Sequence, residues 1–315
     1  MNITSAGSLK AAPLTPTHRF CVNPLHPMMR FLAKWMARGL LVLVALAVLA
    51  LGVIYTGSEW ILRRRHTTPI DAALRLPPSS DDVEARRQAA IIGCYEGCHG
   101  KTGQGLTMVE PGIHRITAPS LTEVLPTYTD GELVRLLRYG MRRDGTTALL
   151  MPADTFYPMS DEHIGQIVTF LRRQPVVSGP PRVRELSLKA RLGILLGKYP
   201  LSVVGVDPSS PRWGTQPRTT PFERGRYTAS TVCAECHAPS FEGDPIDGGP
   251  SLRIVGAYDL PAFRHLLRTG EPVGGPRDIG IMGEVARDAF AQFRDDEIDD
   301  LYVFLRARAG LPPAR

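Results

Sequence analysis

Cysteine is scarce in this chain: there are five among 315 residues, and four of the five fall in two short motifs. No cysteines are therefore left over to build a disulfide framework. The fifth, Cys21, stands alone before a long apolar segment, and we expect it to be a free thiol on the cytoplasmic side of a membrane.

A clustered basic surface is missing as well, although the formal net charge is +6. Residues 1–66 hold eight Lys or Arg and one acid, which leaves 29 bases against 30 acids in the rest of the chain. Nucleic-acid binding, which needs a clustered basic face, therefore has no support. No GxGxxG motif follows a strand either, so the sequence does not indicate a dinucleotide site of a dehydrogenase.

The most specific motif is CAECH at residues 233–237. Two thiols separated by two residues and followed by a histidine are typical of c-type haem attachment. Cys233 and Cys236 can each form a thioether with one vinyl group of the porphyrin, while His237 reaches the iron from the same side. Half of a zinc site and a thioredoxin-like redox pair are the alternatives. Zinc needs a second pair of ligands, however, and a redox pair has no use for the histidine.

A related motif, CYEGCH, occupies residues 94–99 and carries one more residue between the thiols. The extra residue must bulge out if both thioethers are to form, and Gly97 would permit the unusual backbone torsions of such a bulge. We expect a second haem here, attached to Cys94 and Cys98 with His99 on the iron. A structural cysteine is the alternative.

The sequence that follows each motif favours two haems, because the same landmarks recur in the same order. Their spacings agree to within a few residues, which predicts an internal duplication of a unit of roughly 90 residues. The landmarks are PSL at 119–121 and 250–252, LLRxG at 136–140 and 266–270, a methionine at 151 and 282, and FLR at 170–172 and 304–306.

Helical patterns dominate the rest of the chain. Ser160 caps one of the segments, and Pro175 ends it. The segment 185–198, apolar at 186, 188, 192, 195 and 196, is expected to pack across one or both repeats. No strand-like alternation of useful length is found, so the predicted fold is all-α, with two tandem domains behind one transmembrane helix. The helices are expected at 82–92, 130–139, 160–173, 185–198 and 222–232.

One apolar run near the amino terminus is long enough to cross a bilayer, which takes about 20 residues. Residues 39–55 contain no charge, and basic residues flank the run on both sides, so the positive-inside rule does not decide its orientation. Because bacterial c-type haem is attached outside the cytoplasm, we place the chain after about residue 63 in the periplasm, anchored by a single pass in the inner membrane. A cleaved signal peptide is the alternative, but the run is long and lacks an Ala-x-Ala site.

These patterns give a domain plan for the whole chain. The stretch from residue 63 to about 82, which contains prolines and serines, is expected to act as a spacer that lifts the first domain off the membrane. The plan is 1–38 cytoplasmic and disordered, 39–62 transmembrane anchor, 63–85 linker, 86–178 first domain, 179–221 interdomain linker with a helix, and 222–311 second domain.

The sixth iron ligand of the second domain is expected to be Met282, the only methionine after His237. Thioether ligation is typical of cytochromes that carry electrons, because the soft sulfur favours ferrous iron. His265 is the competitor. It aligns with Arg135 of the first repeat and is expected on the surface.

The first domain offers more than one methionine. Met151 precedes a proline in a loop and aligns with Met282 in the repeat. Met159, just before the Ser160 cap, is better explained as a hydrophobic staple. Met141 follows Gly140 and is the rival.

The motifs, the PSL turns, the methionine segments and the closing helices resemble those of membrane-anchored dihaem cytochromes c. Such proteins resemble the cytochrome c subunits of bacterial membrane-bound dehydrogenases for alcohols and gluconate. The resemblance covers most of residues 86–311. It implies two covalent haems, with Met151 and Met282 as axial ligands. It also implies that the carbonyls of Pro119 and Pro250 accept the proton of the ligating histidine.

Two functions are weighed. In the first, the protein is not an enzyme: it relays electrons from a dehydrogenase subunit or quinol to a terminal oxidase or a small redox protein. In the second, it is a dihaem peroxidase with one open iron. The two methionine candidates favour the carrier, because a thioether fills the position where peroxide would bind. A membrane anchor suits a relay fixed beside its partner.

Overall fold

The computed structural model describes residues 27–95, 97–243 and 249–312. The chain divides into two compact units, residues 1–52 and 53–315. The first unit contains most of helix α1 (Pro27–Arg63). By length and composition, Met28–Arg63 could cross a membrane, because it contains an 18-residue window with a mean hydropathy of 2.6.

Helix α1 begins earlier than expected. Residues 27–38, predicted to be disordered, are helical, whereas residues 1–26 and Cys21 lie outside the described part. The reason is local: Phe31 and Trp35 stack one turn apart, with ring centroids 6.0 Å from each other, and Arg38 lies over the Trp35 ring at 5.5 Å. Such pairs extend a helix beyond its apolar core.

The first repeat is built from helices whose ends are capped by their own sequence. The Asp81 side chain accepts from two backbone amides at the start of α2, Thr129 forms a capping box with Glu132, and Ser160 accepts from the amide of His163. These caps explain why the predicted helices are confirmed nearly to the residue. The elements are α2 (Asp82–Ile91), α3 (Leu121–Val124), η1 (Leu125–Thr127), α4 (Asp130–Tyr139), α5 (Ala153–Phe156) and α6 (Asp161–Arg173).

The second repeat follows the same order. The helix expected at 222–232 is confirmed, but its last turn widens into a π-helical turn, η3, that ends on Cys233. The backbones of α8 and α12 cross so closely that a Cβ atom at Gly225 would collide with the carbonyl of Asp300. The elements are η2 (Trp213–Thr215), α8 (Pro221–Thr228), η3 (Ala229–Cys233), α9 (Ala234–His237), η4 (Leu252–Ala257), α10 (Leu260–Thr269), α11 (Ile281–Asp288), η5 (Phe290–Gln292) and α12 (Asp295–Arg308).

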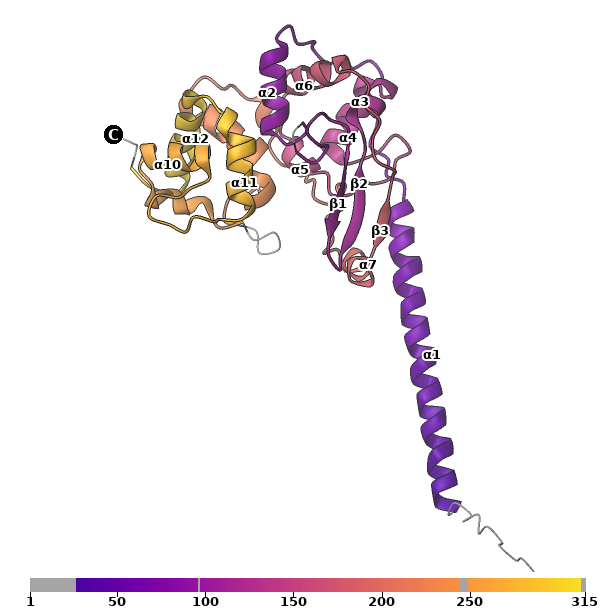
Figure 1. The fold of residues 1–315 in the computed structure, drawn as a ribbon. Helices are drawn as coiled ribbons and strands as arrows, with labels where there is room; N and C mark the ends of the chain where they lie inside the picture. The colour runs from indigo at the N-terminus through magenta and orange to yellow at the C-terminus, as the bar shows by residue number, and fades with distance from the viewer. Residues whose placement is uncertain (1–26, 96, 244–248, 313–315) are drawn as a thin grey trace, which may run out of the picture. The chain divides into compact units, whose positions relative to one another are not determined.

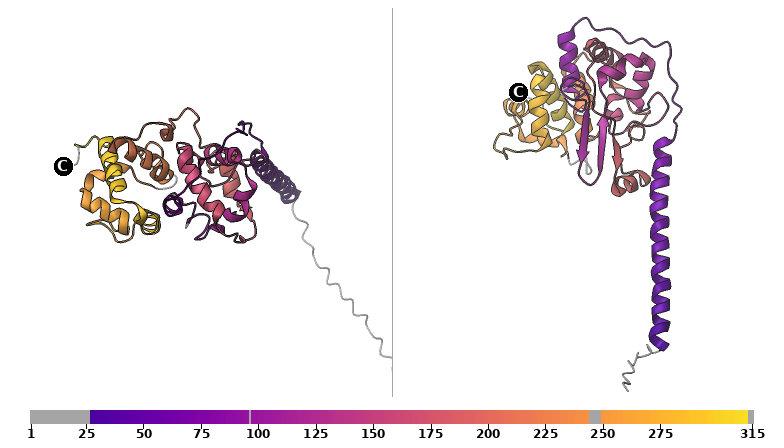
Figure 2. Two further views of the ribbon diagram at one scale, coloured as in Figure 1. Left: turned by 90° about the horizontal axis from the view of Figure 1, so that it is seen from above. Right: turned by 45° about the vertical axis from the view of Figure 1, so that its right-hand side comes forward.

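The prediction of an all-α fold is wrong in one place. A three-stranded antiparallel sheet, ordered β1-β2-β3, is formed by segments that lie in the sequence between the first cysteine motif and α7. Gly112, at a φ of 74°, turns the hairpin, and β-branched residues such as Val109 and Ile116 favour extended backbone. The strands, visible in Figure 1 and in the right-hand view of Figure 2, are β1 (Leu106–Glu110), β2 (His114–Ala118) and β3 (Arg184–Leu186).

The segment 185–198 also departs from the prediction. Its first residues form β3, and Ser187 then caps a shorter helix, α7 (Leu188–Leu195). Leu186, Ala190 and Ile194 are buried against Ile116 of the first repeat, so the expected packing against one repeat is found. The apolar positions 188, 192 and 196 are exposed instead. Residues 184–186 pair with β2, and α7 then turns Ala190 and Ile194 toward the second core, which leaves 188, 192 and 196 on the opposite face.

The spacer before the first repeat packs against that repeat. The amide of Leu76 donates to Asp130 Oδ2 at 2.8 Å, and Leu76 is buried. Gly131 and Gly165 leave room for the carbonyls of Asp71 and Pro77, where a Cβ atom would collide. Residues 71–77 therefore form part of the folded unit, although they lack regular structure.

A main hydrophobic core runs through both repeats without a break. It joins residues of α2, α4 and α6 to residues of the second motif, α10 and α12. Helix α5 contacts both η3 and α9. A smaller second core joins Leu62 at the end of α1 to the sheet and α7. The repeats are thus packed on one another rather than joined only by a linker.

Candidate haem-binding sites

The second motif is presented by a change of helical pitch. The π-helical turn η3 ends at Cys233, α9 carries Cys236 and His237, and Ala238 then leaves the helix at a positive φ of 61°. Turns of this kind are frequent at functional sites. Both thiols are half-buried, and burial raises the pKa of Cys233 to about 12, which is typical of a thiol in apolar surroundings.

The two histidines make the same contact. Nδ1 of His237 lies 2.7 Å from the carbonyl oxygen of Pro250, and Nδ1 of His99 lies 2.8 Å from that of Pro119. A carbonyl can only accept, so Nδ1 carries the proton and Nε2 keeps a lone pair for a metal. Burial lowers the pKa of His99, which favours the neutral, ligating form.

A glycine six residues after each histidine supports this geometry. The amides of Gly105 and Gly243 donate to the carbonyls of His99 and His237, at 2.8 and 3.2 Å, and both glycines have φ near 90°. A Cβ atom at either position would collide with the backbone of the Pro-Ser turn. The sequence analysis missed this pair, although its equal spacing from the histidines was visible.

The longer spacer of the first motif is accommodated differently from the prediction. Gly97 does not supply a positive φ; Gly93 and Gly100, on either side, do so at 71° and 78°. Gly97 instead supplies space, because a Cβ atom there would approach the Gly93 carbonyl oxygen to 2.5 Å. The same carbonyl accepts from the amide of Cys98 at 3.1 Å. Cys98 is exposed, and Cys94 is half-buried against the main core.

The methionines differ in their surroundings. Met151 and Met282 are both half-buried and pack against the main core. Met151 lies in the loop before α5, but Met282 lies in the first turn of α11, not in a loop as expected. Met141 is buried in a bridge with Thr147, and Met159 is fully buried beneath the Ser160 cap, as expected of a staple.

His265, the alternative to Met282 as an iron ligand, is exposed on α10. Its counterpart Arg135, however, is buried and donates to the carbonyls of Arg142 and Arg143 at 2.8 and 3.0 Å. His265 therefore lies on the surface as expected, but the alignment with Arg135 was not a sound reason to place it there.

The two motifs border the same hydrophobic core, because Cys94 and Cys233 both pack against it. Burial raises the pKa of Cys94 to about 12, and the negative charges of Cys98 and Glu235 contribute to the same shift. Glu235 lies between the two thiols of the second motif in sequence.

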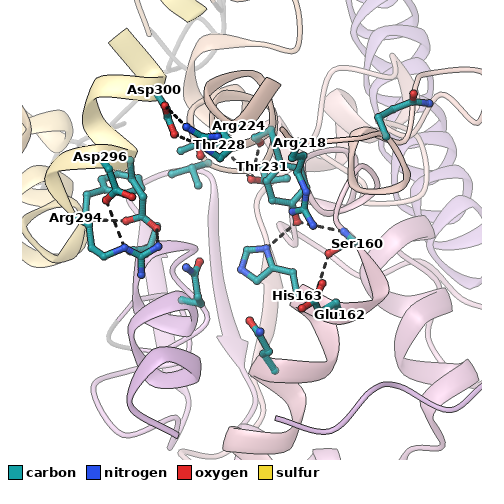
Figure 3. A pocket seen from close by; sticks show the side chains of 18 of the residues that line it. Ser160, Glu162, His163, Arg218, Arg224, Thr228, Thr231, Arg294, Asp296 and Asp300 are labelled. Atoms are coloured by element: carbon teal, nitrogen blue, oxygen red, sulfur yellow. Dashed lines mark hydrogen bonds and ion pairs between the residues drawn. The ribbon is translucent and has the colours of Figure 1, made fainter. Parts of the chain in front are cut away.

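Sequence reasoning missed a polar contact that joins the repeats. Nδ1 of His163, on α6, lies 2.8 Å from the hydroxyl of Tyr227, on α8. That hydroxyl also accepts from the amide of Ser160 at 3.2 Å. Figure 3 shows His163 and Ser160 facing a cavity of about 590 Å³, with Arg224 and Asp300 across it. The sequence could have indicated that His163 is buried, because it lies four residues before Ile167 on the apolar face of α6, but it gave no sign of the partner.

Comparison with known proteins gives the sequence a context. No protein-family model matches the chain. The chain is similar to the cytochrome c subunit of alcohol dehydrogenase (quinone) from Gluconacetobacter polyoxogenes. The two are 24% identical over 291 residues, covering 77% of this chain and 60% of that protein. The protein of the same description from Komagataeibacter europaeus gives the same values.

A third relative carries a different description. The fructose dehydrogenase cytochrome subunit of Gluconobacter japonicus is 24% identical over 282 residues, covering 78% of this chain and 56% of that protein. The chain therefore spans less than two thirds of the length of the curated relatives that it matches. The resemblance to cytochrome subunits of bacterial dehydrogenases, inferred from the motifs, is confirmed.

Proposed function

We propose that this chain is a membrane-anchored electron-transfer protein with two c-type haems. The observation that carries the proposal is the repeated histidine geometry: His99 and His237 each follow a pair of thiols, and each Nδ1 meets a proline carbonyl, at 2.8 and 2.7 Å. This leaves both Nε2 atoms available for iron. The similarity to cytochrome c subunits supports the same function.

The chain's own residues suit the group. Cys233 and Cys236, and Cys94 and Cys98, would form the thioether bonds. Gly105 and Gly243 keep the histidine loops closed, because a Cβ atom at either position would collide with the backbone. Met151 and Met282 would supply the second axial ligands from the edge of the main core. When bound, haem iron supplies a one-electron couple whose potential thioether ligation raises.

The relay would run through both repeats. Cys94 and Cys233 border one core that holds the repeats together, so electrons could pass between two haems without domain motion. By analogy with the relatives, the donor would be a dehydrogenase subunit, and a terminal oxidase or small redox protein would accept the electrons. Helix α1 would anchor the relay in the inner membrane, with both repeats in the periplasm.

The first experiment counts haems and identifies their ligands. Mass spectrometry of the mature chain should show the mass of two added haems. Met282→Ala and Met151→Ala should each remove about half of the weak near-infrared band of sulfur-bound ferric haem, since each would ligate one of two irons. Met141→Ala, buried but outside the proposed ligand set, is the matched control and should leave the band intact.

The outcome that would overturn the carrier function is equally direct. If the unmodified reduced protein bound carbon monoxide readily at one haem, that iron would have an open position. Consumption of peroxide at an enzyme-like rate would then favour the peroxidase. A single added haem would refute the proposed site at Cys94 and Cys98.

A further inference from the structure

Helix α7 carries an apolar stripe that the fold does not cover. Leu188, Leu192 and Leu196 lie four residues apart and are exposed by 43%, 42% and 60%. The opposite face is buried: Ala190 and Ile194 are exposed by only 2% and 3% within the second core. Residues spaced by four lie on one face of a helix, so the three leucines form a continuous surface.

This helix is fixed to the end of α1. Arg191 donates to the hydroxyl of Ser58 at 3.0 Å, and its guanidinium lies 4.6 Å from the centre of the Tyr55 ring. Leu195 fits against Gly57, where a Cβ atom would approach its side chain to 2.8 Å. These contacts set the level of α7 along α1 at residues 55–58.

A second tie holds the neighbouring strand to the same turns. Arg184, in β3, donates to Glu59 Oε1 at 2.7 Å, and Ser58 is fully buried beneath these contacts. Residues 184–195 and the last turns of α1 thus share one packed junction. The leucine stripe cannot swing away from the end of α1 without breaking it.

The sequence of α1 places this junction at a membrane surface. Tyr55 ends the uncharged run, Trp60 follows it, and three arginines begin at Arg63. Tyrosine and tryptophan gather where the hydrocarbon meets the headgroups, and charges mark its outer limit. A helix bound at residues 55–58 therefore lies where a bilayer ends.

The charge of α7 suits the same place. Residues 188–198 contain Lys189, Arg191 and Lys198 and no acidic residue. Lys189 lies next to Leu188 in the sequence and Lys198 follows Leu196, and both are exposed. Apolar residues flanked by lysines are typical of helices that lie in a bilayer surface, where anionic headgroups attract the basic residues.

We propose that α7 lies on the outer surface of the bilayer, with Leu188, Leu192 and Leu196 inserted at the boundary between headgroups and acyl chains. The inference rests on the proposed role of α1 as a membrane anchor. It adds a second point of contact, in which α7 fixes the angle at which the haem-bearing repeats stand on the membrane. A single helix would leave the repeats free to tilt about its end.

The test uses the full-length, haem-loaded chain in bilayers of phosphatidylcholine and phosphatidylglycerol. Cys21→Ser removes the free thiol, and an environment-sensitive fluorophore is attached at Leu192→Cys. Matched labels at Val273→Cys, in an exposed apolar position that is 65% accessible, and at Leu46→Cys, within α1, serve as controls. Each label is measured with and without a quencher carried by the lipid acyl chain, so that quenching by haem cancels in the ratio.

The inference requires that the label at 192 be quenched by a shallow lipid quencher at least severalfold more than the label at 273. The label at 46 should respond to a deep quencher. If 192 behaved like 273 while 46 stayed deep, the inference would fail with the anchor intact. If 46 were also in water, the anchor itself would be refuted. Protection of 192 only after a dehydrogenase is added would make the stripe a protein-docking surface, which also overturns the inference.

Discussion

The imidazole of His163 shows how a single buried group can make the stability of the molecule depend on pH. The ring is buried between the repeats, and burial, with the nearby charge of Arg218, lowers its pKa from the usual 6.5 to about 4. Its Nε2 atom has no hydrogen-bond partner within the described part of the chain. The folded protein therefore keeps His163 neutral, whereas the unfolded chain protonates it near pH 6.5.

This gives a prediction with a definite sign. Because the folded pKa lies below the unfolded one, the unfolded state binds more protons between pH 6.5 and 4, and stability falls as the pH falls through that window. Between pH 7 and 5 the loss should be roughly 2 kcal/mol. The His163→Gln variant has no titrating group at this position, so its loss of stability over the same pH range should be smaller by that amount. Urea unfolding of both proteins at the two pH values measures the difference, and equal losses would contradict the argument.

Gly97 gives a second prediction at the same scale. Gly97→Ala would force a Cβ atom to within 2.5 Å of the Gly93 carbonyl oxygen. The bulged first motif should distort, and covalent haem at Cys94 and Cys98 should fall well below that of the unmodified chain. Gly193→Ala is the control, because a Cβ atom there has only ordinary contacts of 3.5 Å or more. Haem per chain, measured by mass spectrometry, should stay at two in the control; an unchanged value in Gly97→Ala would refute the steric role.

At this scale the sequence indicates the candidate site residues but not their contacts. Thiol spacing and the adjacent histidine follow from what haem attachment requires, so they could be found without a structure. The role of Gly97 could not, because a collision with Gly93 depends on where the bulge places the carbonyl. The partners of His163 could not be predicted either, because Tyr227 lies in the other repeat.

At the scale of elements, local signals decided which predictions succeeded. Helices α2, α4 and α6 have caps written in their own sequence, and each was predicted almost to the residue. The short strand β3 has only three residues and is defined by its pairing with β2. Such strands carry almost no periodic signal, so the sheet was missed and the helix after it was extended too far.

Arg138 and Arg268, the arginines of the two LLRxG segments, are expected to contribute unequally to stability. Arg138 donates to the carbonyl of Met159 at 2.8 Å and to Asp161 at 2.6 Å, which ties α4 to the start of α6. Arg268 makes the equivalent bonds to Ala291 and Asp295 in the second repeat, at 2.6 and 2.7 Å. The side chain of Arg138 is 4% exposed and that of Arg268 is 31% exposed.

Replacing the buried member should therefore be the more damaging change. Arg138→Ala leaves a buried carbonyl unpaired and should cost about 2–3 kcal/mol. Arg268→Ala, where water can substitute, should cost about 1 kcal/mol or less. Denaturant titrations of the two single variants check the order. A larger loss for Arg268→Ala would show that exposure does not govern the strength of this tie.

For the whole molecule, the sequence predicted two tandem domains and a linker, but not how closely they pack. The main core includes residues of both repeats, and Arg87 on α2 is bonded to Glu297 on α12 at 2.7 Å. Glu84 joins the same network through Arg294 at 3.1 Å, and the hydrogen bond from Arg87, with the charges of both arginines, lowers the pKa of Glu84 to about 2. Contacts between segments 210 residues apart in sequence leave no local pattern, which is why the duplication was visible and the interface was not.

The shared core makes a prediction about cooperativity. If the repeats unfolded independently, unfolding one would not change the stability of the other. Here, unfolding either repeat exposes apolar surface of both. It also breaks the Arg87–Glu297 ion pair, whose side chains are 15% and 17% exposed. Both should therefore unfold in one thermal transition. Glu297→Ala should lower that single midpoint by roughly 2–4 °C per kcal/mol lost, without splitting it. Calorimetry in detergent, followed together with the absorbance of the haems, tests this. Two resolved transitions in the unmodified protein, or a shift confined to one half in Glu297→Ala, would mean that the repeats fold as separate domains after all.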